Sequence, residues 1–254
     1  MADIKQSVQS QFGRVAENYR TSAVHAAGTD LQRIVALVAA HPVERALDAG
    51  CGAGHTAAGI APHVTDVTAF DLTPTMLEQV TRLAAERGLS NLTTRQGDVE
   101  ALPFEDASFD LVVSRYSAHH WPHPAIAVQE IARVLKPGGR FILSDIMAAD
   151  DPAQDTFLQT LELLRDPSHV RDHSPAQWQS IFRDAGLTPT VDLTWLLPLN
   201  FESWVERIQT PALHVEMLKS LFDGAPVEIR EAFQIQPIYD FCIPGALVIG
   251  TKET

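Results

Sequence analysis

The feature that most constrains the fold is a regular alternation of short apolar runs and helix-like stretches between Val43 and Ile146. The runs have the length of buried strands, and the stretches between them have the spacing of helices with one apolar face. Alternating units of this kind build α/β folds whose neighbouring strands run parallel. The strands expected in this region are Arg45–Asp48, Asp66–Asp71, Leu92–Gln96, Phe109–Ser114 and Arg140–Asp145.

The clearest helix in this region carries Ile126, Ile131 and Val134 on one side and is followed by Lys-Pro-Gly-Gly at residues 136–139. Proline cannot continue a helix, and glycine accepts a positive φ. These four residues are therefore expected to form a turn that ends the helix and binds no ligand.

Beyond Asp145 the alternation becomes irregular. One helix is expected after Asp150 and another after Ser174, whose hydroxyl is suited to cap it. Two more strands are expected at Thr190–Leu199 and Cys242–Thr251.

The chain has 254 residues, 45% of them hydrophobic, which suits one domain with a sizeable core. We expect a helical cap at residues 1–42 and a core made of residues 43–200 and 236–254. Residues 201–235 are expected to form a helical lid inserted into the core, over the sheet edge where ligands bind in open α/β folds. The alternative is that the apolar side chains of this part of the chain are ordinary core. They are Trp195, Phe201, Trp204, Ile208, Leu213, Met217, Leu218 and Phe222.

Charge and cysteine content limit the partners and the location. The 32 acidic and 19 basic residues give a formal net charge of −13, which repels nucleic-acid phosphates and anionic membranes. Neither is expected as a partner. No secretion signal is recognised, no apolar run reaches the ~20 residues of a membrane span, and Cys51 and Cys242 are expected to be reduced. We expect a cytoplasmic monomer or homodimer.

A glycine-rich segment at residues 48–54 joins the first strand to a helix expected to begin near His55. Glycines let a ligand approach the backbone, and a helix N-terminus offers free N–H groups to an anion. Dinucleotide-binding turns usually follow Gly-x-Gly-x-x-Gly/Ala, but the third glycine comes one residue earlier here. A pyrophosphate ligand is disfavoured, and a merely tight connection is the alternative.

Two acids follow at strand ends. Asp71 ends the second strand, where a carboxylate can accept both hydroxyls of a ribose. Combined with the glycine turn, it points to an adenosine moiety, although Asp71 could instead cap the helix after Thr73. Asp98 ends the third strand and is placed to accept from an exocyclic amine such as that of adenine.

Five motifs together resemble the class I methyltransferases that use S-adenosylmethionine (SAM). The likeness is greatest to the small-molecule methyltransferases similar to the C-methyltransferases of ubiquinone and menaquinone biosynthesis. It covers about residues 43–146 and implies a Rossmann-like, doubly wound, seven-stranded, mainly parallel sheet with an antiparallel last strand. The motifs are residues 48–54, Asp71 with Met76, residues 96–98 with 101–104, residues 108–112 and residues 134–139.

The resemblance also implies roles for single residues. In this family the glycine turn carries the methionine part of SAM, the acid matching Asp71 holds the ribose, and the acid matching Asp98 binds the adenine amine. The residue after the fourth strand lies beside the methyl group, and an N-terminal helix, here Phe12–Tyr19, folds over the site. The SAM-binding residues expected on this basis are Asp48, Ala49, Gly50, Cys51, Gly52, Asp71, Leu72, Met76, Asp98, Val99, Ser114, Arg115 and Tyr19.

Methyl transfer from a sulfonium mainly requires that a nucleophile be aligned and water excluded, so a catalytic base is optional. The candidates are His119 and His120, which follow the fourth strand and whose imidazoles titrate near neutral pH. The alternative is that they cap or pack a short helix. No metal is expected, because no carboxylate cluster or third zinc ligand accompanies them. His25 near the N-terminal cap and His169 or His173 before Ser174 are expected at the surface, and the alternative is that they reach a substrate pocket.

The expected function is therefore methyl transfer from SAM to an O, N or C nucleophile of a small, apolar or aromatic molecule. Two alternatives use the same SAM-binding residues. One is a SAM-fold enzyme that transfers no methyl group, such as a cyclase, a decarboxylase or a SAM-modifying enzyme. The other is a SAM-binding sensor.

Overall fold

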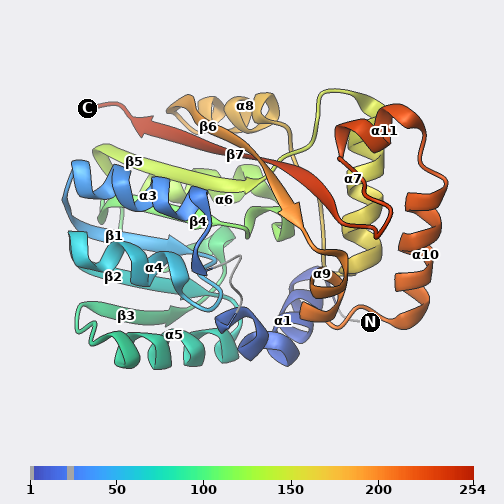
Figure 1. Cartoon of the computed structure of the whole chain (residues 1–254). Coiled ribbons are helices and arrows are strands. Elements are labelled where there is room, and N and C mark those ends of the chain that lie inside the picture. Colours follow the sequence, from blue (N-terminus) through green and yellow to red (C-terminus); the bar gives the residue numbers. More distant parts are fainter. Residues whose placement is uncertain (1–2, 22–25) are drawn as a thin grey trace.

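The computed structural model describes residues 3–21 and 26–254, so His25 lies outside it. Its seven-stranded sheet has the order β3-β2-β1-β4-β5-β7-β6 (Figure 1). The strands β1 to β5 pair in parallel, and β7 is antiparallel to both of its neighbours. The mainly parallel sheet with an antiparallel last strand is confirmed. The strands are β1 (Val43–Ala49), β2 (Val64–Asp71), β3 (Leu92–Gln96), β4 (Phe109–Arg115), β5 (Leu135–Ile146), β6 (Leu187–Leu199) and β7 (Phe241–Lys252).

The largest difference from the sequence prediction is the start of β5. The residues at 136–139, expected as a turn, lie inside this strand. The pairing of β4 with β5 jumps from Phe109 opposite Leu135 to Leu111 opposite Arg140, so the intervening residues form a bulge. The turn interpretation was wrong, because the helix ends at Val134 and the next residue, Leu135, already pairs with β4, so the proline and glycines lie within the strand.

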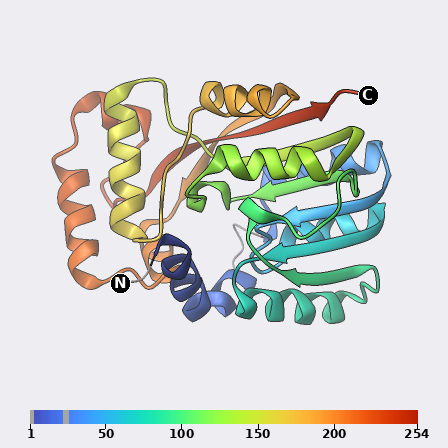
Figure 2. The same ribbon diagram turned by 180° about the vertical axis from the view of Figure 1, so that it is seen from behind.

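Helices cover both faces of the sheet, as a doubly wound fold requires. The face with α3, α4 and α5 buries Ile34, Ile60 and Val80, and Figure 2 shows the opposite face with α6 and α8. Ser174 caps α8, as the sequence predicts. The elements of the two faces are α3 (Thr29–Ala40), α4 (His55–Ile60), α5 (Pro74–Arg87), α6 (Pro124–Val134) and α8 (Pro175–Asp184); short 3₁₀ turns are η1 (Ala61–His63), η2 (Val99–Ala101) and η3 (Ala118–His120).

A second group of helices lies at the carboxyl ends of the parallel strands, at the right in Figure 1. It packs around Phe157, Leu161 and Phe222. Of the eight side chains assigned to a lid or to core, Leu213 and Met217 are 71% and 45% exposed. Most of the others are core: Phe201, Trp204, Ile208, Leu218 and Phe222 are buried. The helices are α7 (Pro152–Arg165), α9 (Phe201–Arg207), α10 (Ala212–Asp223) and α11 (Val227–Ala232).

The helix α1 (Ile4–Arg20) spans the gap between this group and the sheet. Gln9 Nε2 donates to the Leu72 carbonyl at 2.8 Å, and Gln11 Nε2 donates to the Ile208 carbonyl at 2.8 Å. The helix therefore closes over the carboxyl end of the sheet. In the part of the chain that the structure describes, no helix has the length and apolar character needed to cross a bilayer.

Candidate functional site

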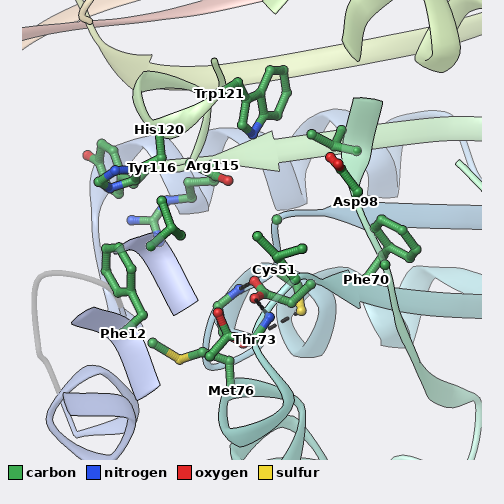
Figure 3. Close-up of a pocket in the computed structure, with 18 of the residues that line it drawn as sticks. Phe12, Cys51, Phe70, Thr73, Met76, Asp98, Arg115, Tyr116, His120 and Trp121 are labelled. Atoms are coloured by element: carbon green, nitrogen blue, oxygen red, sulfur yellow. Dashed lines mark hydrogen bonds between the residues drawn. The ribbon is translucent and has the colours of Figure 1, made fainter. Parts of the chain in front are cut away.

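A large cavity lies where β1 and β4 end, the point at which the strand order reverses. It contains about 990 Å³ of empty space, part of it open to solvent, and small-molecule sites usually enclose ~300–1,000 Å³. Figure 3 shows Asp98 and Phe70 on one side of it and Phe12, Tyr116 and His120 on the other. Open α/β sheets bind ligands at this position.

The glycine turn forms one wall of the cavity. Gly50, with φ of 73°, would bring a Cβ within 2.0 Å of the Ser117 hydroxyl, so no larger residue fits there. A Cβ on Gly52 would meet no protein atom within 4 Å. The backbone at Gly52 is therefore open to close approach by a ligand, and Cys51 also lines the cavity.

Asp71 lies in the cavity wall at the end of β2. Its Oδ2 accepts from the Gly52 N–H at 2.9 Å and its Oδ1 from the Thr73 N–H at 2.8 Å. Burial raises the pKa of this carboxyl, while the backbone donors oppose the rise. The helix cap of α5 is Thr73 itself, so Asp71 braces the glycine turn against the start of α5. Leu72 and Met76 line the cavity beside it.

Asp98 and Val99 line the cavity just beyond β3, next to the end of β2, where Asp71 pairs with Gln96. Its Oδ2 is 2.5 Å from the ammonium of Lys5 on α1, which is also 2.5 Å from Glu100. Its Oδ1 accepts from the Glu100 N–H at 3.0 Å. This end of the site is therefore polar and is closed by α1.

Three of the expected SAM-binding residues lie behind the cavity wall. Asp48, Ala49 and Ser114 are completely buried, at 0% exposure, and do not line the cavity. Asp48 Oδ2 accepts from the Ala57 N–H at 2.9 Å, which ties β1 to α4. Burial raises the pKa of Asp48 to about 7. Of the two residues expected after β4, Arg115 lines the cavity, and its guanidinium pairs with buried Asp30.

The two candidate catalytic histidines lie side by side, with ring centroids 4.3 Å apart. His120 lines the cavity, whereas His119 lies behind it, its Nδ1 2.6 Å from Asp145 Oδ1. Burial would lower the pKa of His119, but the Asp145 carboxylate raises it to about 9. Burial and the charge of His119 lower the pKa of His120 to about 4. At neutral pH His119 is a cation and His120 is neutral.

A second, smaller pocket adjoins the first. Four residues line both: Phe12, Tyr19, Tyr116 and His120. The pocket continues toward α7 and α9, where its further walls are His119, Ile146, Glu162, Arg165, Leu197, Leu199, Trp204, Arg207 and Ile243.

Several residues of the larger cavity are not predicted from the sequence. Phe70, Thr73, Tyr116 and Trp121 line the cavity without belonging to the set expected to bind SAM. Tyr116 has a φ of 51°, a strain that only coordinates reveal. His169, expected at the surface, is 7% exposed, because its ring packs 5.8 Å from that of His119.

Among residues 3–21 and 26–254 no group of three or more His, Cys, Asp or Glu side chains is arranged to hold a metal ion. The expectation that no metal takes part stays a prediction.

Comparison with known proteins identifies relatives of the whole chain. Residues 47–143 match the family described as "Methyltransferase domain". Over 251 residues the chain is 40% identical to the uncharacterized methyltransferase YcgJ of Bacillus subtilis, covering 96% of this chain and 99% of the relative. It is 44% identical over 187 residues to the uncharacterized protein YafE of Escherichia coli, covering 74% and 90%. The crystal structure of YcgJ aligns with a TM-score of 0.85 at 38% identity, over 89% of this chain and 98% of that one.

Proposed function

The chain belongs to the class I SAM-dependent methyltransferases, and from this premise we propose that its larger cavity binds SAM and its smaller pocket binds the methyl acceptor. As a member of the family it is an enzyme that transfers the methyl group of SAM to a small molecule. The proposal concerns where each reactant lies and which residues act on it.

The observation that supports this arrangement is the wall shared by the two pockets. The ribose-binding role proposed for Asp71 and the adenine-binding role proposed for Asp98 place the nucleoside at one end of the larger cavity. The methionine part then follows the glycine turn toward Arg115, and the sulfonium lies near Tyr116 and His120. The second pocket opens at that same end.

The residues of the larger cavity suit this ligand chemically. The open face of Gly52 admits the ligand to the backbone. The carboxylates of Asp71 and Asp98 are acceptors for hydroxyl and amine hydrogens. The remaining residues expected to bind SAM would act from the lining (Cys51, Leu72, Met76, Val99 and Tyr19) or from behind it (Asp48, Ala49 and Ser114).

When bound, SAM supplies a methyl group that the acceptor's nucleophilic atom takes as the carbon–sulfur bond breaks, its electron pair remaining on sulfur. The chain's own contribution is alignment and the exclusion of water. Phe12 and Tyr19 of α1 close the junction of the pockets, their rings 5.3 Å apart. We propose that the ring of Phe12, 4.9 Å from that of His120, covers the reacting atoms.

The histidines then have different roles. We propose that His120, neutral and at the junction, accepts a hydrogen bond from the acceptor and orients it, because a group with a pKa of about 4 holds a proton too weakly to store it at neutral pH. His119 is the positioning residue, since Asp145 fixes its ring and its charge keeps His120 neutral.

The finer features of partner and location are also proposals. Ile146, Leu199 and Trp204 line the second pocket and favour an acceptor with an apolar or aromatic body. The helices α9 to α11, with the helical residues around them at 201–235, would then be the lid of the acceptor site, and residues 1–42 its N-terminal cap. The free thiols Cys51 and Cys242 favour the cytoplasm. A monomer or homodimer is expected.

The test is to incubate the purified protein with methyl-labelled SAM and a pool of phenols, amines, quinones and carboxylates, followed by mass spectrometry. We expect one labelled acceptor and an equal amount of S-adenosylhomocysteine. The reaction without the pool controls for hydrolysis of SAM. Tight SAM binding with neither product would favour a sensor, and an altered, unmethylated product would favour the non-methylating alternative.

A further inference from the structure

The second pocket combines apolar walls with two arginines. Arg165 comes from the end of α7 and Arg207 from the end of α9, and both line the pocket. Arginine is costly to bury unless its charge is balanced. The charged groups that surround these two guanidinium groups therefore indicate which kind of ligand the pocket binds.

Arg165 has its partners within the protein. Its guanidinium Nη1 is 3.7 Å from Glu162 Oε2, and its Nε donates to the Trp204 carbonyl at 3.1 Å. The same group lies 4.9 Å from the centre of the Trp204 ring, close enough for a cation–π contact. Glu162 is the carboxylate that lines the pocket, and it forms its ion pair with Arg165.

Arg207 has no such balance. It is half-buried, and among the described residues no carboxylate oxygen lies within 4.0 Å of its guanidinium. Burial and the charge of Arg165 lower the pKa of Arg207, and the weaker, opposing influence of Tyr19 and Glu162 does not cancel this fall. The imidazolium of His119, which lines the same pocket, is paired with the Asp145 carboxylate behind it. Arg165 and His119 each have a carboxylate partner, and in the described part of the chain Arg207 has none within 4.0 Å, although the chain carries a net charge of −13.

We infer that the methyl acceptor is an organic acid, whose carboxylate pairs with Arg207 and whose apolar body packs on Ile146, Leu199 and Trp204. The inference rests on the proposed function and narrows its substrate class. A carboxylate matches the fork of an arginine, forming two parallel hydrogen bonds. It also supplies the negative charge that Arg207 lacks.

The experiment uses protein saturated with S-adenosylhomocysteine and three matched pairs of probes: benzoate and benzamide, cinnamate and cinnamamide, octanoate and octanamide. Titration calorimetry measures the dissociation constant of each. Because an amide keeps the shape of the acid and removes its charge, we expect at least one acid to bind about tenfold or more tightly than its amide. The Arg207→Gln variant should lose this preference, and Arg207→Lys should keep part of it.

Arg183→Gln is the matched control, since Arg183 is exposed on α8, away from the pocket. It should leave the preference unchanged. Equal affinities within every pair, no binding of any of the three acids, or a preference that survives Arg207→Gln would each overturn the inference. Failure of the proposed function is distinguishable, because S-adenosylhomocysteine itself would then fail to bind before any probe is added.

Discussion

At the scale of the residue, the acids at the strand ends differ in what they face. Asp48 and Asp71 both lie next to the glycine turn, yet Asp48 is buried behind the cavity and holds the start of α4, whereas Asp71 lines the cavity. The motif predicts that both matter, but a sequence cannot say which carboxylate reaches the ligand. That depends on how β1, enclosed between β2 and β4, turns into α4.

The first residue-scale prediction is that Asp71→Ala weakens SAM binding by about 1–3 kcal/mol, the cost of losing a hydrogen-bonded charged partner. The expected loss includes the brace to the Gly52 N–H. Titration calorimetry with SAM measures it. Asp66→Ala, an exposed carboxylate at the other end of the same strand, is the control and should not alter affinity. Unchanged affinity for SAM in Asp71→Ala would show that the Asp71 side chain does not contribute to SAM binding.

At the scale of the element, the alternation of strand-like and helix-like stretches predicts all seven strands, including β3, whose residues Leu92–Gln96 are mostly exposed, and β6, which alternates between buried and exposed residues. The bulge at the start of β5 could not be predicted, since proline and glycine indicate a turn whether or not the sheet continues around it. The second pocket could not be predicted either. Its walls include His119, which follows β4, and residues of α7 and α9. Contacts between segments so far apart in the chain leave no local pattern in the sequence.

The helix α1 carries an element-scale prediction. The single ammonium of Lys5 links it to Asp98 and Glu100 across the cavity. Lys5→Ala should loosen the first turns of α1 and speed amide hydrogen exchange of residues 4–12 by about fivefold, since partly exposed ion pairs contribute up to ~1 kcal/mol. Lys219→Ala, which removes a surface ion pair of α10, should leave this exchange rate unchanged. No acceleration in Lys5→Ala would show that α1 is held by other contacts.

At the scale of the whole molecule, His119 links folding to pH. Its pKa is about 9 in the folded protein and 6.5 for the ordinary side chain. Below about pH 6.5 both folded and unfolded states bind the proton, so the stabilisation is complete. Between about pH 6.5 and 9 only the folded state keeps it, and the stabilisation is lost as the pH rises, by at most ~1.4 kcal/mol per pH unit.

The measurement is denaturant unfolding of the wild type and His119→Gln at a series of pH values from 6 to 9.5. The difference between their free energies of unfolding should be greatest at pH 6 and shrink toward pH 9.5. Taking this difference cancels the contributions of distant groups that titrate alike in both proteins. A difference that stays constant across the window would mean that His119 carries no extra charge in the folded state.

The position of β7 between β5 and β6 has a consequence for biosynthesis. This strand follows β5 and β6 in the chain and leaves the ribosome after them, yet it lies between them in the sheet. Until it arrives, β5 and β6 each present an open edge, the feature through which strands of different molecules pair and aggregate. Ile243 on β7 also completes the wall of the second pocket. The second pocket is therefore complete only after synthesis has passed β7, so a nascent chain that already holds its glycine turn and acids still lacks this pocket.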